Sequence, residues 1–497
     1  MSTVRYERVS DVPVAKRAKQ ARVLPPLVVD LDRTLVKTDL LIESLLALLR
    51  QHPLYLFLLP VWLARGKANF KHEVAQRVSL QIPTLPWRNE LIDDLKRQRD
   101  EGRSLVLATG SDMRVAQAVA DHLKIFDLVL ATGLSVNLCG EAKRDLLVSH
   151  FGERGFDYAA DGAWGTDDDL TVWRSARKAI LVNPPLRKRN EIERVATIDR
   201  VFADGENGAA ARLRALRPAH WLKNLLVFVP VFAAHRFHEI APLEKSFLAF
   251  IAFGCCASSG YLFNDLIDLD ADRHHPHKQS RPFAAGELPL SYALGMIPAL
   301  LLAGCILGAL VSPFLAAMLV AYFALSATYS LHVKKVAILD VLFLAGLYSI
   351  RIMAGSAAVG IWSSHWLLAF SIFLFFSLAL VKRYGELVIM RQIDGDGARA
   401  RAYELSDGEL LAAMGIASGY LAVSVLALYI ASDKAGALYA RRELLWFLCP
   451  LLLYWISHIW LTAHRGKMQD DPVVFATSDR TSSLLLLSML ATAIGSV

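Results

Sequence analysis

Apolar residues are concentrated in the second half of the chain, in runs separated by short charged loops. From about Arg217 onward, the runs approach the roughly 20 helical residues needed to cross the ~30 Å hydrocarbon core of a bilayer. An earlier apolar stretch, around Leu45–Leu63, is interrupted by Pro53 and Pro60 and predicts a cap or a helix resting on the membrane. We predict about nine spans, the first and last of them short: Leu222–Phe237, Leu248–Phe263, Ser291–Val311, Pro313–Leu331, Leu339–Gly360, Trp362–Leu380, Leu410–Ile430, Leu444–Leu461 and Leu484–Val497.

The first 200 residues show a different pattern, in which short β-rich runs alternate with helical segments such as Met113–Leu123 and Leu170–Ala176. This alternation is typical of βαβ units and a parallel sheet. The predicted fold is therefore an α/β domain followed by an all-α polytopic membrane bundle. We expect a basic tail at 1–23, the α/β domain at 24–185, a charged linker at 186–216 and the membrane domain at 217–497. The predicted strands are Leu27–Leu31, Ser104–Ala108, Asp127–Ala131, Phe156–Ala160 and Ala179–Val182.

Composition and charge agree with a membrane protein. Hydrophobic residues make up 54% of the chain and charged residues 20%, compared with roughly 45–50% and about 25% in soluble proteins. Counted from a cytoplasmic N-terminus, the even-numbered loops carry thirteen Lys and Arg residues and the odd-numbered loops five. This bias places the even loops and the N-terminal domain on the cytoplasmic side of a bacterial-type cell (inner) membrane. It also accounts for the net charge of +7, so we expect no nucleic acid partner.

The five cysteines exclude a disulfide scaffold, and no two of them have the CxxC spacing of a metal or redox motif. Four of the five lie in apolar stretches, where cysteine usually packs as a small core residue. We therefore expect no cysteine-based zinc site.

Polar residues follow successive predicted strands of the α/β domain. Asp30 and Asp32 follow the first strand, Thr109 the second and Asp161 the fourth. Parallel sheets bind ligands at the carboxyl ends of their strands. One carboxylate of the first pair could attack phosphorus while the other acts as general acid/base, with Thr109 and Lys143 on the phosphoryl oxygens. An isolated Asp-x-Asp pair is commonly a solvated turn, but the ordered set favours a phosphoryl site with Mg²⁺ at Asp161 or the Asp167–Asp169 run.

This set resembles the haloacid dehalogenase-like (HAD) phosphatase superfamily over about residues 24–185. The matching segments are VVDLDRTLV, LATGSD, GEAKRDLL, YAAD and DDLTVW. The sequence departs from the family at Arg33, where a glycine is usual, and at Ala160-Asp161-Gly162, where Gly-Asp-Ser is usual. The resemblance implies a Rossmann-like domain with the following site: Asp30 as nucleophile, Asp32 as acid/base, Thr109 and Lys143 as phosphate ligands, and Asp30, Asp32, Asp161 and Asp169 around the metal.

The densest acidic pattern lies after the second predicted span, in YLFNDLIDLDADRHHPHKQSRPFAAGELP. Asn264, Asp268 and Asp272 recur every four residues and Asp265 lies three before Asp268, so their oxygens share one helix face. Stacked carboxylates at a membrane edge are costly unless positive charge is present. A Mg²⁺ ion bridging a diphosphate meets that need, whereas the alternative is a solvated loop of mixed charge.

Basic and hydroxyl residues gather at the same predicted membrane face. A single Lys or Arg at the end of a span is commonly an interfacial anchor. Several clusters that converge with the acidic loop instead favour a polyanion site open to the cytoplasm. The candidate substrate ligands are Arg217, Lys223, Lys278, Arg281, Tyr329, Lys334, Arg351, Lys382 and Arg383.

The membrane half resembles the UbiA superfamily of prenyltransferases over about residues 212–497. Within it, the match is to the branch of decaprenyl-phosphate phosphoribosyltransferases. Asp340 has no second Asp four residues away, although aromatic prenyltransferases of the superfamily usually carry such a pair, and this favours the phosphoribosyl branch. The segments that carry the match are RPAHWLKN, NDLIDLDADRHHPHKQSRP, YSLHVKKVAILD, SIRIMAG, KRYGEL and DDPVVFATSDRTS.

This resemblance implies Mg²⁺-dependent transfer of 5-phosphoribosyl from phosphoribosyl pyrophosphate (PRPP) to a polyprenyl phosphate. The acidic loop would hold the Mg²⁺-bound diphosphate, with Asp268 and Asp272 as catalytic residues. Lys334 would stabilise the departing pyrophosphate, while Arg217, Lys223 and Arg351 would hold the lipid phosphate. The fused phosphatase would then remove the 5′-phosphate of the product.

Two other functions remain open, a prenyltransferase acting on an aromatic or other acceptor and a transporter or lipid-binding scaffold. The sequence also leaves open whether the chain forms a homo-oligomer.

Overall fold

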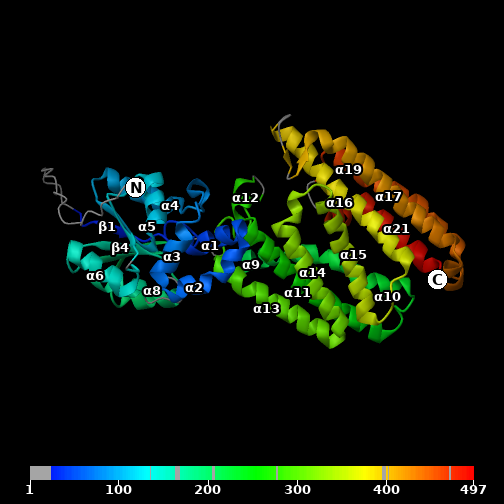
Figure 1. Ribbon diagram of the computed structural model, residues 1–497, viewed down its shortest axis with the longest axis horizontal. Helices are drawn as coiled ribbons and strands as arrows, with labels where there is room; N and C mark the ends of the chain where they lie inside the picture. Colours follow the sequence, from blue (N-terminus) through cyan, green and yellow to red (C-terminus); the bar gives the residue numbers. More distant parts are fainter. Residues whose placement is uncertain are drawn as a thin grey trace. The chain divides into compact units, whose positions relative to one another are not determined.

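The computed structural model describes residues 24–134, 136–162, 168–203, 208–275, 278–394, 399–400, 402–468 and 472–497. The predicted basic tail at 1–23 lies outside these residues. The chain forms two compact units (Figure 1). The first contains residues 24–41 and 57–203, and the second contains residues 42–56 and 208–497.

The first unit contains a six-stranded sheet in the order β3-β2-β1-β4-β5-β6, in which all neighbouring strands are parallel. Side chains alternate between its two faces, so Leu27 and Val29 enter one core and Val28 enters the other. The strands are β1 (Leu27–Val29), β2 (Leu105–Asp112), β3 (Leu128–Thr132), β4 (Asp157–Ala160), β5 (Lys178–Val182) and β6 (Thr197–Phe202).

Helices cover both faces of this sheet. Helices α4 (Asn89–Asp100) and α5 (Met113–Leu123) contribute to the core that contains Leu27. Helices α6 (Gly140–Phe151), α7 (Asp168–Ser175) and α8 (Leu186–Glu193) contribute to the core that contains Val28. The remaining helical segments of the unit are α2 (Leu59–Ala64), α3 (Lys67–Ala75) and η2 (Ile82–Thr84).

The structure confirms the predicted α/β class and all five predicted strands, and it adds a sixth. Residues 186–202, which we expected to belong to a linker, instead form α8 and the edge strand β6. The sequence of β6, TIDRVF, carries two charged residues, and most of its side chains are exposed. An edge strand needs no apolar run, so its hydrophobic signal is weak.

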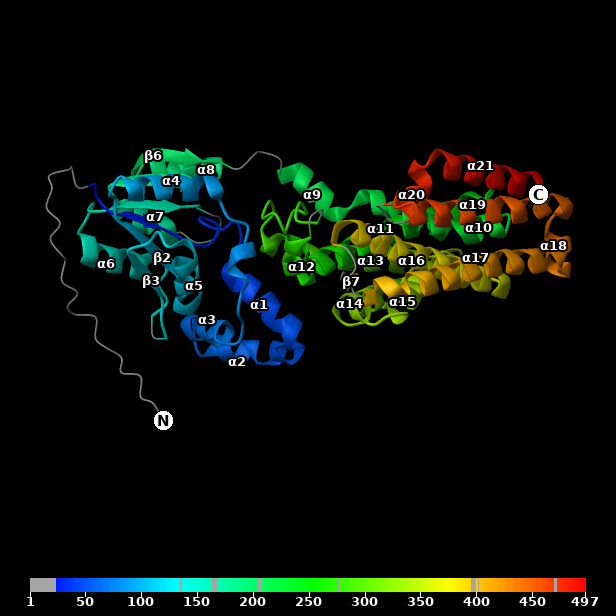
Figure 2. The ribbon, with the colours of Figure 1, turned by 90° about the horizontal axis from the view of Figure 1, so that it is seen from above.

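Seven helices in the described part of the second unit are long and apolar enough to cross a membrane. Their long axes follow a common direction in both views (Figure 1, Figure 2). They are α11 (Ile240–Ile267), α13 (Leu290–Val311), α14 (Pro313–Leu331), α15 (Leu339–Val359), α16 (His365–Asp394), α17 (Gly408–Ala431) and α19 (Leu448–His464). The span that contains α19 starts at Arg442, because a 3₁₀ segment directly precedes the helix.

The other two predicted spans have a different form. The first, Leu222–Phe237, is divided between the 3₁₀ segment η3 (Pro218–Phe228) and the short helix α10 (Val229–Ala233). The last is α21 (Arg480–Gly495), which is apolar but has only 16 residues. The shorter elements of the unit are α1 (Leu40–Gln51), η1 (Pro53–Phe57), α9 (Gly208–Leu216), α12 (Leu269–His274), η4 (Val333–Lys335), β7 (Arg399–Ala400), β8 (Tyr403–Glu404), η5 (Leu405–Asp407), α18 (Asp433–Leu438), η6 (Arg442–Phe447) and α20 (Pro472–Ser478).

The long helices pack through small residues and direct large apolar side chains outward. A Cβ atom on Gly304 of α13 would lie 2.8 Å from the Ala252 carbonyl oxygen of α11, so these helices approach closely only because the position is glycine. Leu302 and Leu310 of α13 are 62% and 77% exposed. Exposed leucines on long apolar helices are expected where lipid, not water, surrounds the protein.

Helix α1 packs within the helical unit, although it follows the first strand of the sheet in sequence. Ile42 and Leu46 pack against a buried cluster that includes Leu262 and Phe283. The Glu43 carboxylate accepts two hydrogen bonds from the Arg273 guanidinium, at 2.9 and 2.6 Å, and both side chains are buried. This bidentate ion pair fixes α1 against α12.

Candidate functional site

The acidic residues of the membrane unit lie at the C-terminal end of α11 and along α12. Asn264 and Asp265 belong to the last turn of α11, Asp268 lies between the two helices, and Asp272 belongs to α12. Asp265 and Asp272 are 2% and 3% exposed. The helical spacing therefore brings the four predicted side chains to one end of the unit, largely out of solvent.

Three cations and one hydroxyl from distant parts of the chain contact these residues. The Arg281 guanidinium lies 3.3 Å from the Asp265 carboxylate and 2.6 Å from that of Asp272. Arg217 also pairs with Asp265, and the Lys334 ammonium, on η4, pairs with Asp268. The Ser330 hydroxyl donates to the Asn264 side-chain oxygen at 3.0 Å. The structure thus unites the predicted acidic residues with Arg217, Arg281 and Lys334.

The donor set of this acidic cluster fits Mg²⁺ together with a diphosphate. All its potential ligands are oxygens, and Asp265 Oδ2 is buried with no hydrogen-bond partner among the described residues. Burial raises the pKa of the Asp272 carboxyl, while Arg281 acts to lower it. Across the described residues, no three acidic, His or Cys side chains converge closely enough to hold a metal alone. Mg²⁺ commonly takes one or two carboxylates and completes its shell with phosphate oxygens and water.

Arg351 forms a second polar cluster inside the helical unit. Its guanidinium donates to the Asn224 side-chain oxygen at 3.0 Å and to the Tyr322 hydroxyl at 2.7 Å. It lies 5.6 Å from the ring centre of Tyr348, and the Lys223 ammonium lies 5.4 Å from the same ring. A buried cation held by neutral groups and aromatic rings keeps its charge available to an anion.

Arg383 has a buried environment that sequence reasoning did not anticipate. Its guanidinium donates to Asp340 at 2.6 Å, to Glu386 at 2.8 Å and to the Tyr329 hydroxyl at 2.7 Å. Asp340 and Arg383 are 0% and 1% exposed. Tyr403 donates its hydroxyl to Asp340 at 2.5 Å and accepts the Ile338 N–H at 2.8 Å. Through these contacts, Arg383 and Tyr329 help to hold the loop between α14 and α15, and this loop carries Lys334.

The remaining predicted substrate ligands, Lys278 and Lys382, are half-buried. Lys278 lies in the turn between α12 and α13, and Lys382 lies on α16 next to Arg383. The contacts described for the three clusters do not include either residue.

The N-terminal unit has its own polar cluster at the carboxyl end of the sheet. The Lys143 ammonium of α6 donates to Asp30 at 3.0 Å and to the Tyr158 hydroxyl at 3.1 Å. Asp32 accepts hydrogen bonds from the Ser111 hydroxyl at 2.6 Å and the Leu40 N–H at 2.7 Å. Thr109 is fully buried on the neighbouring strand β2, where its hydroxyl accepts the Ser111 N–H at 3.0 Å.

Burial governs the protonation of this cluster. It raises the pKa of Asp32 to about 7 and also raises that of Asp30, which Lys143 acts to lower. Burial alone would lower the pKa of Lys143, but Asp30 and Asp169 outweigh it, so the net shift is upward. A charged lysine beside one carboxylate and a readily protonated second carboxylate suit phosphoryl transfer chemistry.

Two of the four carboxylates expected near a metal in this unit, Asp161 and Asp169, lie against other side chains. Asp161 lies 3.3 Å from the Arg33 guanidinium, and Asp169 accepts the Tyr158 hydroxyl at 2.6 Å. Arg33 has a φ of 58°, in the left-handed region that favours glycine. Asp167 lies outside the described residues. Arg33 therefore occupies a glycine-type backbone position and directs a cation at a predicted metal ligand.

Sequence reasoning missed three residues near this cluster. Ser111 lies within the motif LATGSD but was given no role, and Tyr158 is indistinguishable from a core residue of its strand. The Lys71 ammonium, on α3, donates to the Gly110 carbonyl at 2.6 Å and the Asn137 side chain at 2.8 Å. Lys71 lies 39 residues from Gly110, so only the tertiary structure reveals this contact.

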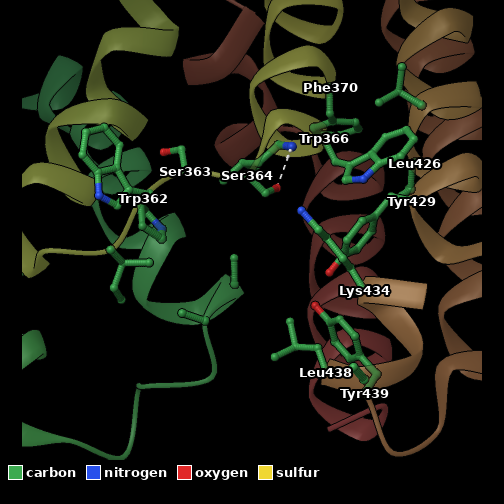
Figure 3. Close-up of a pocket in the computed structure, with 17 residues that line it drawn as sticks. Trp362, Ser363, Ser364, Trp366, Phe370, Leu426, Tyr429, Lys434, Leu438 and Tyr439 are labelled. Carbon is green, nitrogen blue, oxygen red and sulfur yellow. Dashed lines mark hydrogen bonds between the residues drawn. The ribbon is translucent and has the colours of Figure 1, made fainter. Parts of the chain in front are cut away.

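A cavity of about 510 Å³ lies at the other end of the helical unit (Figure 3). Trp362, Trp366, Tyr429 and Lys434 line it, at the end of α15, the start of α16, the end of α17 and α18. Helix α15 begins beside the Asp340–Arg383 pair and ends at this cavity, which is therefore remote from the acidic cluster. It is mostly apolar, and the described residues that line it include no carboxylate.

A comparison with known families matches the part of the chain that contains the acidic cluster. The model of the UbiA prenyltransferase family matches residues 225–484, which contain the whole acidic run and Lys334. The chain belongs to the UbiA prenyltransferase family. The helical unit is thus a multi-pass membrane transferase domain.

Relatives extend the match beyond the UbiA region. The uncharacterized protein y4nM of Sinorhizobium fredii is 33% identical over 461 residues, covering 92% of this chain and 88% of that one. The decaprenyl-phosphate phosphoribosyltransferase of Mycobacterium tuberculosis is 30% identical over 294 residues, covering 58% of this chain and 94% of that enzyme. A UbiA homolog from Archaeoglobus fulgidus, solved with GPP and Mg²⁺, is 17% identical over 57% of this chain and 99% of its own, with a TM-score of 0.45.

Proposed function

We propose that the membrane unit transfers 5-phosphoribosyl from PRPP to a polyprenyl phosphate. The observation that carries the proposal is the acidic cluster, in which Asp265, Asp268 and Asp272 are matched by Arg217, Arg281 and Lys334. Three carboxylates and three cations at one membrane edge suit a substrate that brings both a diphosphate and its metal. The similarity to a decaprenyl-phosphate phosphoribosyltransferase over 94% of that enzyme supports this substrate class.

In this proposal, Asn264, Asp265, Asp268 and Asp272 hold the diphosphate through Mg²⁺, which when bound stabilises negative charge on the leaving oxygens. Lys334 and the arginines then contact the outer phosphate oxygens. A lipid phosphate oxygen attacks the anomeric carbon of the ribose and forms the new C–O bond. The bond from that carbon to pyrophosphate breaks, and the electron pair leaves with the pyrophosphate.

Arg351 and Lys223 are proposed to receive the lipid phosphate. Arg351 is 3% exposed and Lys223 is 8% exposed, and both lie beside Tyr348 within the helical unit. The Asn224 side-chain nitrogen there is buried and has no hydrogen-bond partner among the described residues. Two cations and an unused donor inside the helical unit suit an anion attached to a hydrocarbon chain.

The test uses the purified full chain in nanodiscs with PRPP, a C50–C55 polyprenyl phosphate and Mg²⁺. Mass spectrometry should detect polyprenyl-phosphoryl-ribose-5-phosphate, and pyrophosphate should be released in equal amount. Asp268→Asn should lower the rate by at least about 100-fold, as expected when a group that supports charge stabilisation at the reacting site is removed. Asp270→Asn is the matched control, because Asp270 is 39% exposed and is not part of the acidic cluster.

A prenyltransferase acting on another acceptor is the competing function. It predicts pyrophosphate release from a polyprenyl diphosphate and no turnover of PRPP. If pyrophosphate were released from a polyprenyl diphosphate but not from PRPP, the phosphoribosyl proposal would be wrong. The family assignment would still hold.

We also propose that the N-terminal unit is a phosphatase that removes the 5′-phosphate of the product, with both sites on the cytoplasmic side of the inner membrane. Asp30 beside Lys143, with Asp32 two residues further on and Thr109 on the adjoining strand β2, supports attack of a carboxylate on phosphorus. The match to y4nM over 92% of this chain indicates that both units occur together in another protein. In the nanodisc assay, Asp30→Asn should abolish release of inorganic phosphate and leave pyrophosphate release unchanged.

A further inference from the structure

Residues 53–64, which form η1 and α2, present an unusual apolar surface. Six of their large apolar side chains are more than two-fifths exposed: Leu54, Leu56, Phe57, Leu58, Val61 and Leu63. Leu54 and Phe57 reach 78% and 76%. Trp62 is the exception, because it is buried beneath the Arg77 guanidinium, 4.7 Å from its ring centre. Trp62 therefore anchors the segment, and most of its other apolar side chains are exposed.

The charged residues within this part of the sequence are all basic. The sequence has no Asp or Glu between Glu43 and Glu73, a stretch that contains Arg50, Arg65 and Lys67. Arg65 and Lys67 directly follow the apolar residues and are exposed. A water-facing loop gains nothing from this pattern, whereas a segment that lies on anionic lipid headgroups needs it.

The preceding helix fixes where this segment begins. Helix α1 is held in the helical unit by the buried Glu43–Arg273 pair, and Arg273 adjoins Asp272 of the acidic cluster. Arg50, in the last turn of α1, lies 3.8 Å from the Asp270 carboxylate of α12, so residues 53–56 follow α1 at the same end of the helical unit as the acidic cluster. That end is where the helices of a membrane unit meet the headgroup region of one leaflet.

The length of the segment excludes a span. Twelve helical residues would extend about 18 Å at 1.5 Å per residue, short of the ~30 Å hydrocarbon core. Pro53 and Pro60 further divide it into a 3₁₀ turn and a short α-helix. Such a segment is long enough to lie along an interface.

We propose that residues 53–64 insert into the headgroup and acyl boundary of the leaflet next to the acidic cluster. The occupant of this apolar surface is the bilayer, and the exposed Arg65 and Lys67 face its anionic headgroups. The insertion tethers the start of α3 to the membrane surface, and α3 carries Lys71 of the N-terminal polar cluster.

The test measures the depth of the segment in the full chain. Phe57→Cys, labelled with an environment-sensitive fluorophore, is reconstituted in nanodiscs with or without lipids brominated on their acyl chains. The label should lose about half of its fluorescence to bromolipid and resist aqueous iodide, since interfacial segments lie about 5–10 Å into the boundary. Asp145→Cys on α6 is the control, because that side chain is 65% exposed in the sheet-containing unit. The parent chain, with its five cysteines, gives the background.

Two outcomes would overturn the proposal. Quenching of the Phe57→Cys label by iodide, with the same insensitivity to bromolipid as the control, would mean that the segment faces water. Protection from both quenchers would mean that protein covers it, either a second copy of this chain or another partner. Adding Val61→Glu and Leu63→Glu to the labelled chain should restore quenching by iodide, because charged side chains do not remain in the acyl region.

Discussion

The buried Asp340–Arg383 pair offers the sharpest test of how the membrane unit is built. Asp340→Ala removes a carboxylate that is 0% exposed and leaves a guanidinium that is 1% exposed without its nearest partner. Loss of one member of a buried ion pair costs about 3–5 kcal/mol. Arg383 retains Glu386 and Tyr329, so we expect about 3 kcal/mol, at the lower end of that range.

The assay is thermal unfolding of the purified full chain in nanodiscs. With a shift of about 2–4 °C per kcal/mol, Asp340→Ala should lower the Tm by roughly 6–12 °C. Tyr403→Phe removes only the hydroxyl that donates to Asp340, and a hydrogen bond to a charged group is worth about 1.5–3 kcal/mol, so its shift should be smaller. Glu443→Ala is the control, since that carboxylate is 80% exposed and its loss should change stability by less than about 0.5 kcal/mol.

The same pair should also affect catalysis. Tyr403 accepts the N–H of Ile338, which has a φ of 66°, unusual for a β-branched residue. We expect Tyr403→Phe to loosen the loop that presents Lys334 and to raise the KM for PRPP more than it lowers kcat. An Asp340→Ala chain as stable as Glu443→Ala would refute the reasoning, because it would show that the pair is not desolvated.

Three further predictions test other parts of the chain. Arg33→Gly removes a partly exposed ion pair with Asp161 that is worth about 0–1 kcal/mol. The Mg²⁺ concentration for half-maximal phosphate release should therefore fall by up to about fivefold. An unchanged Mg²⁺ dependence would contradict this prediction. Glu43→Ala should lower the free energy of unfolding by about 3–5 kcal/mol, because it leaves the buried Arg273 unpaired. Faster proteolysis at residues 52–66 would report this loss. Asp479→Ala should cost about 1 kcal/mol in thermal unfolding by removing the N-cap of α21, whereas Asp479→Asn should cost little.

Much of the fold could be predicted from local patterns. The strand β1 lies where its short apolar run placed it, because its side chains enter the cores on both faces of the sheet. The helix α5 lies where periodicity placed it, because it buries one apolar face against the sheet. The long spans follow from length and hydropathy. Strand β6 could not be found in this way, since an edge strand with Asp199 and Arg200 has no apolar run. The divided first span was also hidden, because hydropathy does not report where a helix gives way to a 3₁₀ segment.

The candidate sites show the same division. Helical spacing alone placed Asn264, Asp265, Asp268 and Asp272 on one face, because side chains three and four residues apart are neighbours on any helix. Arg383 matched its neighbours as a basic residue at the end of a span, yet its partner is a carboxylate 43 residues away in sequence. Composition cannot distinguish a cation that awaits a phosphate from one already neutralised inside the protein.

The sequence by itself determined the α/β and membrane classes and the run of acidic residues, because these depend on patterns among residues close together in the chain. Only the tertiary structure decided which cation meets which carboxylate. Arg217 and Arg281 converge on Asp265 from 48 and 16 residues away, and Lys334 reaches Asp268 across 66. Such pairings are set by how helices pack, and packing depends on the shape of all side chains together.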